Sequence, residues 1–419
     1  MNNITKTVIT TLSFLLYINS AVAENKSLLS LFSSKQEPNY QKIYLEAIQK
    51  IKEEYVDEVS EKQLVEAAID GMLSSLDPYS RFLNEDRARE IVETTKGEFS
   101  GIAVEVTMDE KNRLKVISPY ENGPAFKAGI KAGDLVTAID SESTYGLTLS
   151  ELAKKLRGAV GSKVILSIYR EETKESLDIK ITRDIIKLIP VSAVLLPDDI
   201  IYMNIMIFNS KTAEEIKSQY NKLHSSAERP LKGVILDVRW NPGGLFDQAI
   251  ETSNMFLDNG KLIVSVRGRT PENNQEYYSE GSDITNGLPV VIIINSGTAS
   301  APEIVVGALH DNQRAILVGT KTFGKASMQS VIPIEDGSAM KMTTAKYYTP
   351  SGLSIHGYGI EPDIIVQDIE KGLKNRNVNF YDEKSLKKDP QLRRAIELLK
   401  GNYLYNKNDR EESYLSDQN

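Results

Sequence analysis

The spacing of apolar residues changes twice along this chain of 419 residues. Over residues 39–96 apolar side chains recur at helical spacing, as at Ile48 and Ile51, which predicts a helical N-terminal region. Over residues 97–184 short alternating runs are separated by glycine turns, which predicts a small β-rich module with two helices. Over residues 185–370 apolar strands alternate with helical segments, an order typical of an α/β core.

Two of the strands predicted in this core are apolar at every position. They are VVIII at residues 290–294 and GVIL at residues 233–236. Such runs are expected of strands that helices cover on both faces. We therefore expect a multidomain α/β fold, in which the core carries the β-rich module as an insertion and follows the helical region. Residues 371–419 are charged and predict a helical appendage or a loose tail.

The first 23 residues have the form of a secretory signal peptide. One positive charge, Lys6, precedes an apolar run, and the sequence AVA ends at Ala23. A retained anchor is the alternative, but a span needs about 20 apolar residues and this run is shorter. We expect cleavage, a polar lead-in over residues 24–38, and export to the periplasm or to the outer face of the inner membrane.

Composition excludes several classes of function. The chain has no cysteine, so disulfides, thiolate metal sites and cysteine nucleophiles are ruled out together. The formal net charge is −8 and no long Lys/Arg block occurs, so DNA and RNA are not expected as partners.

A serine follows the predicted strand 290–294 and precedes a predicted helix. Pro302 suits the first turn of that helix, because the missing N–H of a proline is not needed there. The hydroxyl of Ser300 would be exposed on such a turn, and free N–H groups at the helix start could stabilise an oxyanion. Most serines before helices are N-caps, so Ser300 alone does not distinguish a nucleophile from a cap.

A lysine 25 residues later offers a base for this serine. The separation between Ser300 and Lys325 suffices for a helix and a return strand, so the side chains could meet. Gln329 would share a face of an extended strand with Lys325 and could orient it. Lysine acts as a base only when neutral, and burial lowers its pKa. Of the three histidines, His356 alone stays open as a competing base.

Four segments together resemble the carboxy-terminal processing peptidases, also called tail-specific proteases. They are TASAPE around Ser300, VGTKTFGKASMQ around Lys325, LDVRWNPGG and TPSGLSIHGYGIEPD. The resemblance spans about residues 38–370 and implies a serine endopeptidase that cleaves proteins near their C-termini without a metal or organic cofactor. It implies Ser300 as nucleophile, Lys325 as its base and Gln329 as the partner of the lysine. Pro302 stands where the family commonly has a second serine.

The same resemblance implies an oxyanion hole at the NPGG loop. The N–H of Gly243 or of Gly244, with slight preference for Gly243, would act together with the N–H of Ala301. A plain strand-to-helix turn is the alternative interpretation of this loop.

Residues 97–184 resemble a circularly permuted PDZ domain, which implies recognition of free, unstructured C-termini of protein or peptide substrates. The segments SGIA and GPAFKAGIKAGD carry the resemblance. The peptide would bind at the loop and strand made by five consecutive residues: Ser100, Gly101, Ile102, Ala103 and Val104.

Arg157 lies just after a predicted helix of this module. It could bridge to the protease core as a gate, and plain solvation at the surface is the alternative. A catalytically inactive scaffold that only binds tails is the rival function. A homo-oligomer or an adaptor protein is left open.

Overall fold

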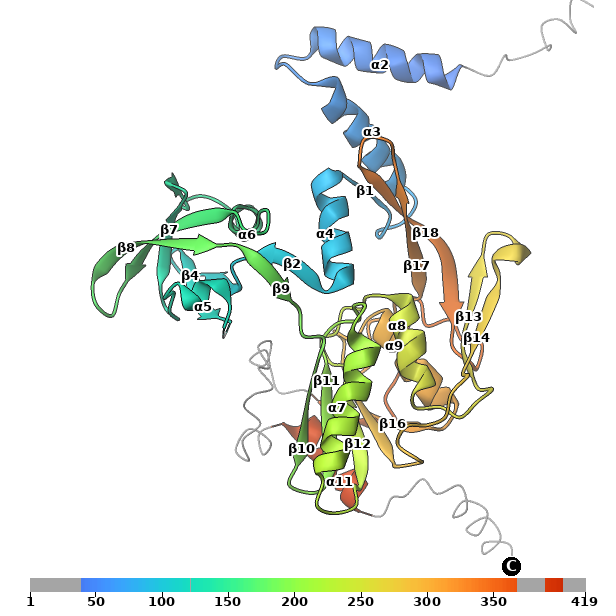
Figure 1. Ribbon diagram of the computed structural model, residues 1–419. Coiled ribbons are helices and arrows are strands. Elements are labelled where there is room, and N and C mark those ends of the chain that lie inside the picture. The colour runs from blue at the N-terminus through green and yellow to red at the C-terminus, as the bar shows by residue number, and fades with distance from the viewer. Residues whose placement is uncertain (1–38, 121, 368–388, 402–419) are drawn as a thin grey trace, which may run out of the picture. The chain divides into compact units, whose positions relative to one another are not determined.

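The computed structural model describes residues 39–120, 122–367 and 389–401 (Figure 1). The predicted signal peptide and lead-in, and most of the predicted tail, lie outside the described residues. The chain divides into two units, residues 1–72 and 73–419. No helix in the described ranges is long and apolar enough to cross a membrane.

In the described residues of the first unit lie helix α2 (Tyr40–Glu54) and most of helix α3 (Glu61–Ser74). Asn39 caps α2 by accepting a hydrogen bond from the N–H of Lys42 at 3.1 Å. An N-cap of this kind satisfies one of the free donors at a helix start. The local sequence therefore forms the helices that the apolar spacing predicts.

The β-rich module contains a six-stranded sheet in the second unit. Its strands are β3 (Val104–Met108), β4 (Leu114–Pro119), β5 (Leu135–Ile139), β6 (Glu142–Ser143), β7 (Lys163–Arg170) and β8 (Glu175–Thr182). The helices are α5 (Pro124–Lys127) and α6 (Leu149–Leu156). Thr148 and Glu151 form a capping box that fixes the start of α6. The two ends of the module pair through β2 (Glu98–Gly101) and β9 (Asp184–Lys187).

The α/β core is built on a second six-stranded sheet, in the order β10-β11-β12-β15-β16-β19. The strands are β10 (Val191–Leu196), β11 (Ile200–Ile205), β12 (Gly233–Asp237), β15 (Val290–Ile294), β16 (Ala315–Gly319) and β19 (Ile364–Ile365). Helices α7 (Thr212–Ser226), α8 (Phe246–Asn254) and α9 (Ala301–Asp311) pack on one face, and α11 (Pro390–Lys400) packs on the other.

Strand β15 shows why its sequence is apolar at every position. Ile292 and Ile294 pack in the cluster that includes α7, α8 and α9, whereas Val291 and Ile293 pack in the cluster that includes α11. All four are almost completely buried. Both faces of the strand are thus covered by helices, and the predicted fold class is confirmed.

A third sheet completes the walls of the site. It consists of β1 (Arg81–Leu83), β13 (Leu262–Gly268), β14 (Gln275–Tyr278), β17 (Ser327–Pro333) and β18 (Ala339–Tyr348), with a short 3-10 helix η1 (Pro271–Asn273) between β13 and β14. Residues 39–96 were expected to be helical. Helix α4 (Glu85–Lys96) agrees with this expectation, and strand β1 departs from it. Three residues are too few to show a strand pattern, so β1 could be recognised only from its pairing with β18.

Candidate active site

Ser300 occupies the turn between strand β15 and helix α9. Its backbone has φ 71°, a region that non-glycine residues seldom adopt. The conformation is held by a hydrogen bond of 2.8 Å from the N–H of Ser300 to Oε2 of Glu303. Gly243 approaches the serine so closely that an added Cβ would lie 2.9 Å from Ser300 Cβ and 3.3 Å from Ser300 Oγ. The turn therefore requires glycine beside the serine.

Glu303 joins the serine turn to the lysine segment. This carboxylate is completely buried and accepts hydrogen bonds from the N–H groups of Ser300 and Lys325, each at 2.8 Å. It also accepts from the Gly324 N–H at 2.7 Å and the Thr322 hydroxyl at 2.6 Å. Burial raises the pKa of Glu303, and these hydrogen bonds oppose the rise. One side chain thus fixes the backbones of both predicted catalytic residues.

Lys325 lies half-buried in the segment before β17. Burial lowers the pKa of its ammonium, the positive charge of Lys341 lowers it further, and Glu303 and Asp77 act in the opposite direction. Its Nζ lies 4.9 Å from the centroid of the Tyr79 ring. No hydrogen bond joins Lys325 Nζ to Ser300 Oγ within the described part of the chain. The two side chains line the same cavity.

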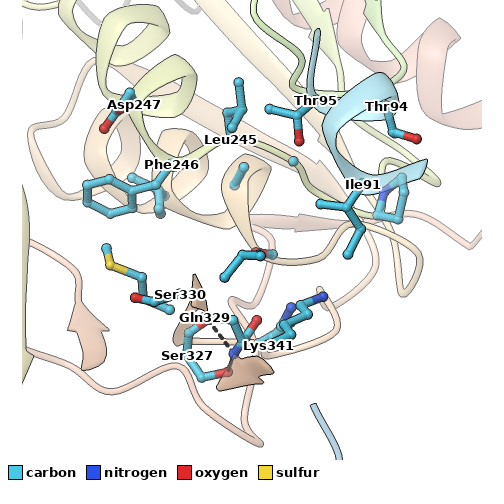
Figure 2. Close-up of a pocket in the computed structure, with 18 of the residues that line it drawn as sticks. Ile91, Thr94, Thr95, Leu245, Phe246, Asp247, Ser327, Gln329, Ser330 and Lys341 are labelled. Carbon is cyan, nitrogen blue, oxygen red and sulfur yellow. Dashed lines mark hydrogen bonds between the residues drawn. The ribbon is translucent and has the colours of Figure 1, made fainter. Parts of the chain in front are cut away.

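That cavity has a volume of about 920 Å³ and lies within the second unit. Its walls come from strand β1, helix α4, the loop before α8, strand β14, the start of α9 and strands β17 and β18. Figure 2 shows Ile91 and Thr95 on one side and Gln329 and Lys341 on the other. A peptide has room to reach Ser300 here.

Gln329 lines the cavity but is not bonded to Lys325. Its amide donates to Ser327 Oγ at 2.8 Å and to Thr343 Oγ1 at 3.2 Å, and Figure 2 shows the contact with Ser327. Strand β17 begins only at Ser327, and its pairing shifts register between Met328 and Gln329. Lys325 therefore precedes the regular strand, and the shared face expected at a spacing of four residues does not arise.

The NPGG loop lies against the serine turn. Gly243 donates its N–H to Asn241 Oδ1 at 2.9 Å, so that donor is already used. Among the described residues, no acceptor is bonded to the N–H of Gly244 or of Ala301. An added Cβ on Gly244 would lie 2.0 Å from the Phe208 carbonyl oxygen, with φ at +141°. Of the three predicted oxyanion residues, Gly244 and Ala301 thus offer unpaired donors.

His310 and His356 make their hydrogen bonds to partners other than Ser300. His310 lies at the far end of α9, where Nε2 is 3.1 Å from Asp363 Oδ1. His356 lies near the lysine segment, where its Nδ1 accepts from the Ala326 N–H at 3.4 Å. No hydrogen bond links either ring to Ser300 in the described ranges.

Comparison with known proteins identifies the family. The model for peptidase family S41 matches residues 199–366, the PDZ domain model matches 115–170, and the model for the N-terminal domain of the activating protease CtpB matches 13–87. The carboxy-terminal-processing protease of Bartonella bacilliformis is 41% identical over 341 residues, which cover 81% of this chain and 78% of that protein. The chain belongs to the carboxy-terminal processing proteases.

A second relative agrees with this assignment, and a solved structure shares the fold. The carboxy-terminal processing protease CtpA of Bacillus subtilis is 34% identical over 362 residues, covering 86% of this chain and 75% of that protein. A solved structure described as an S41 protease from Bacteroides fragilis has a TM-score of 0.50 at 16% identity, covering 78% and 87% of the two chains, and shows the shared fold. This carboxy-terminal processing protease is therefore a serine peptidase with a PDZ domain, as its sequence predicts.

The PDZ residues of this protease lie partly where they were expected. Ser100 and Gly101 belong to strand β2, which pairs with β9, and do not form an open loop. Ile102 and Ala103 are buried, and the Ile102 carbonyl accepts from the Ala125 N–H at 2.8 Å. Val104 starts β3, an edge strand that pairs only with β4 in the described ranges. The free edge of the sheet therefore begins at Val104, the last of the five predicted residues.

Arg157 connects the PDZ domain to helix α4. Its Nη1 lies 2.8 Å from Glu90 Oε1, and its guanidinium carbon lies 5.4 Å from the centroid of the Phe99 ring. Glu90 also lines the cavity that contains Ser300. The ion pair is partly exposed, but Arg157 is not simply solvated.

Several residues that support the site of this protease were not predicted from the sequence. Glu303 could have been found, because serine followed three residues later by glutamate is the capping-box pattern. Tyr347 is buried, donates its hydroxyl to the Lys325 carbonyl, and has a pKa raised mainly by burial. Lys341 reaches the cavity from β18, a strand whose pairing no local pattern reveals.

Arg239, just before the NPGG loop, is another such residue. It is buried between Asp237 and Asp389, with its Nη2 2.9 Å from Asp389 Oδ2, and its Nη1 lies 2.8 Å from Gln391 Oε1. The last described helix, α11, is thereby bonded to a residue just before the NPGG loop.

Proposed function

We propose that this chain is an exported serine endopeptidase that cleaves protein substrates near free C-termini with a dyad of Ser300 and Lys325. The observation that carries the proposal is the single buried carboxylate of Glu303, which accepts from the N–H groups of both residues. Such a clamp holds nucleophile and base at the mouth of one cavity. Preorganised groups of this kind lower the cost of reaching the transition state.

In the proposed reaction, neutral Lys325 removes the hydroxyl proton of Ser300 as the oxygen attacks the peptide carbonyl. The negative oxygen of the tetrahedral intermediate accepts hydrogen bonds from the N–H groups of Gly244 and Ala301. Lys325 then gives its proton to the leaving amine, and an acyl-enzyme remains on Ser300. Water, deprotonated by the same lysine, hydrolyses that ester.

The lowered pKa of Lys325 supports its role as the base. Activity should rise with pH as the ammonium loses its proton. The rise should occur at a pH below the pKa of an ordinary lysine, which is about 10.4. Gln329 is proposed to assist the orientation of the lysine when substrate is bound. Its replacement by alanine should leave partial activity, because the proton acceptor stays in place.

Tail recognition is assigned to the PDZ domain. The edge of β3 can add a substrate strand, and backbone N–H groups near its start can bind the terminal carboxylate. The Arg157–Glu90 pair would carry occupancy of this groove to α4, which lines the catalytic cavity. Export to the periplasm or to the outer face of the inner membrane, and assembly with itself or an adaptor, complete the proposal.

The test of the dyad is cleavage of an unstructured protein by the parent chain, by Ser300→Ala and by Lys325→Ala. Both variants should fall to background, while His356→Ala should stay active. Full activity of either dyad variant would refute the assignment.

The tail proposal is tested with free and amidated substrates and with two variants: Val104→Pro, which interrupts strand addition at the start of the β3 edge, and Arg157→Ala. The parent should prefer the free tail, and both variants should reduce that preference. If all three proteins cleave the free and the amidated substrate at equal rates, tail recognition and gating are refuted. The dyad assignment does not depend on this result.

A further inference from the structure

The cavity that holds Ser300 carries more positive than negative charge. Four cationic side chains line it: Arg81, Arg87, Lys325 and Lys341. The acidic side chains in its lining are Glu90 and Asp247. Glu90 is already paired with Arg157 at 2.8 Å. The cavity therefore presents an excess of positive charge to a bound substrate.

Two of the cationic residues, Arg81 and Lys341, are neighbours with like charge. They lie directly opposite each other in the antiparallel ladder of β1 and β18. Like charges at opposed positions destabilise a sheet. Neither side chain makes an ion pair with an acidic group anywhere in the described residues, and the Arg81 guanidinium has only a contact of 3.5 Å with the Pro78 carbonyl.

Lys341 is also withdrawn from water. Its side chain is half-buried, and burial, with the neighbouring charge of Arg81, lowers the pKa of its ammonium. An unpaired charge in such a place costs free energy, since it gives up hydration without gaining a partner. A ligand with negative charge would offset the repulsion between Arg81 and Lys341 and would supply the acidic partner that both side chains lack.

We propose that Arg81 and Lys341 form a subsite that binds a carboxylate of the substrate chain near the scissile bond. This subsite rests on the proposed cleavage at Ser300, because both residues line the same cavity as the nucleophile. The carboxylate can come from an acidic side chain or from the free C-terminus of the short fragment that leaves. A guanidinium and an ammonium both form charge-assisted hydrogen bonds with carboxylates, and neutral amides bind them less strongly.

Lys341 has a second effect that must be separated from binding. Its positive charge lowers the pKa of Lys325, whereas Glu303 and Asp77 raise it. Removing the charge of Lys341 should therefore shift the pH profile of cleavage to higher pH for every substrate. A carboxylate subsite predicts, in addition, a loss confined to acidic substrates.

The experiment measures peptide binding to the full chain carrying Ser300→Ala, which prevents turnover. One peptide series replaces each Glu in turn by Gln, and a second compares a free with an amidated C-terminus. Removal of the critical carboxylate should weaken binding about tenfold, and this difference should vanish when Lys341→Gln or Arg81→Gln is added. The series that responds identifies the source of the carboxylate.

Lys346→Gln is the matched control, because Lys346 is an exposed lysine on the same strand and does not line the cavity. It should leave the discrimination unchanged, and Lys341→Arg, which keeps the charge, should preserve it. Melting temperatures check that each variant is folded. Equal binding of acidic and neutral peptides, or a preference that survives both neutral substitutions, would overturn the subsite. Failure of the Ser300 proposal would instead appear as no cleavage of any peptide by the parent chain.

Discussion

The two ends of helix α9 hold carboxylates in opposite ways. At its start, Glu303 is completely buried, accepts from uncharged donors, and has a pKa raised by burial. At its end, hydrogen bonds to Asp311 and Asp363 raise the pKa of His310 to about 9. Burial opposes the change at Asp311, yet bonds from His310 and the Ser351 N–H lower its pKa to about 2. Solvent access and the charge of the partner thus decide the direction of each shift.

The difference separates the end of the helix that carries the proposed dyad from an end that is only structural. Both arrangements suit the helix dipole, with an acid in the first turn and a cation in the last. Only the start fixes backbone N–H groups of the two residues of the proposed dyad, Ser300 and Lys325. Changes at the start should therefore reduce catalysis, and changes at the end should reduce stability alone.

Replacement of Glu303 should have the largest effect. In Glu303→Ala the N–H groups of Ser300, Gly324 and Lys325 lose their acceptor, at a cost of about 1–3 kcal/mol for each buried donor. Glu303→Gln keeps the shape but replaces one acceptor oxygen by a donor. We expect kcat/KM to fall at least about a hundredfold in both variants and the melting temperature to fall most in the alanine variant.

Glu361→Gln is the control for Glu303. Glu361 forms an exposed ion pair with Lys321 at 3.0 Å, and such pairs contribute about 0–1 kcal/mol. It should leave activity unchanged. Near-parental kcat/KM in Glu303→Ala would show that the clamp is not needed for catalysis.

Gly244→Ala should have the next largest effect. The new Cβ would lie 2.0 Å from the Phe208 carbonyl oxygen, so the loop must move and its N–H must leave the proposed oxyanion hole. Loss of such a donor lowers kcat by about 10²–10³. Gly260 also has a positive φ, 81°, but open space around the Cβ, so Gly260→Ala reports the strain of a side chain at positive φ without displacement of the backbone. Equal kcat in both variants would contradict the role of Gly244.

His310→Gln should have the smallest effect, and only on stability. The folded-state pKa of about 9 lies above the ordinary value of 6.5, so the stabilisation is complete below pH 6.5 and disappears as pH rises through about 9. The melting temperature of the variant should fall below that of the parent between pH 5 and 6.5 and match it above about pH 9.5. His224→Gln serves as the control. A difference independent of pH would contradict the ion-pair account, and lost activity would contradict the division between the two ends.

The sequence predicted the parts of the site that lie in local patterns. The serine turn followed from an apolar strand and Pro302, and the spacing to Lys325 allowed the two residues to share one cavity. The orientation of Gln329 could not be predicted, because a register shift beside Met328 changes the strand. The contribution of Lys341 depends on sheet pairing, and sequence spacing does not encode that pairing.

For the fold, too, the elements with a local pattern could be predicted and the long-range contacts could not. Runs that are apolar at every position indicated strands buried on both faces, and glycine turns marked the short strands of the PDZ domain. The link from Arg239 to Asp389 joins residues 150 positions apart in the sequence, so no local pattern could indicate it.

The most direct test of the central claim is covalent labelling of the full chain with a serine-directed phosphonylating reagent, followed by mass analysis of the modified peptide. The account predicts one adduct, on Ser300, that forms faster as pH rises through the lowered pKa of Lys325 and forms far more slowly in Lys325→Ala and Glu303→Ala. An adduct on another residue, or labelling of Ser300 at an unchanged rate in Lys325→Ala, would contradict it.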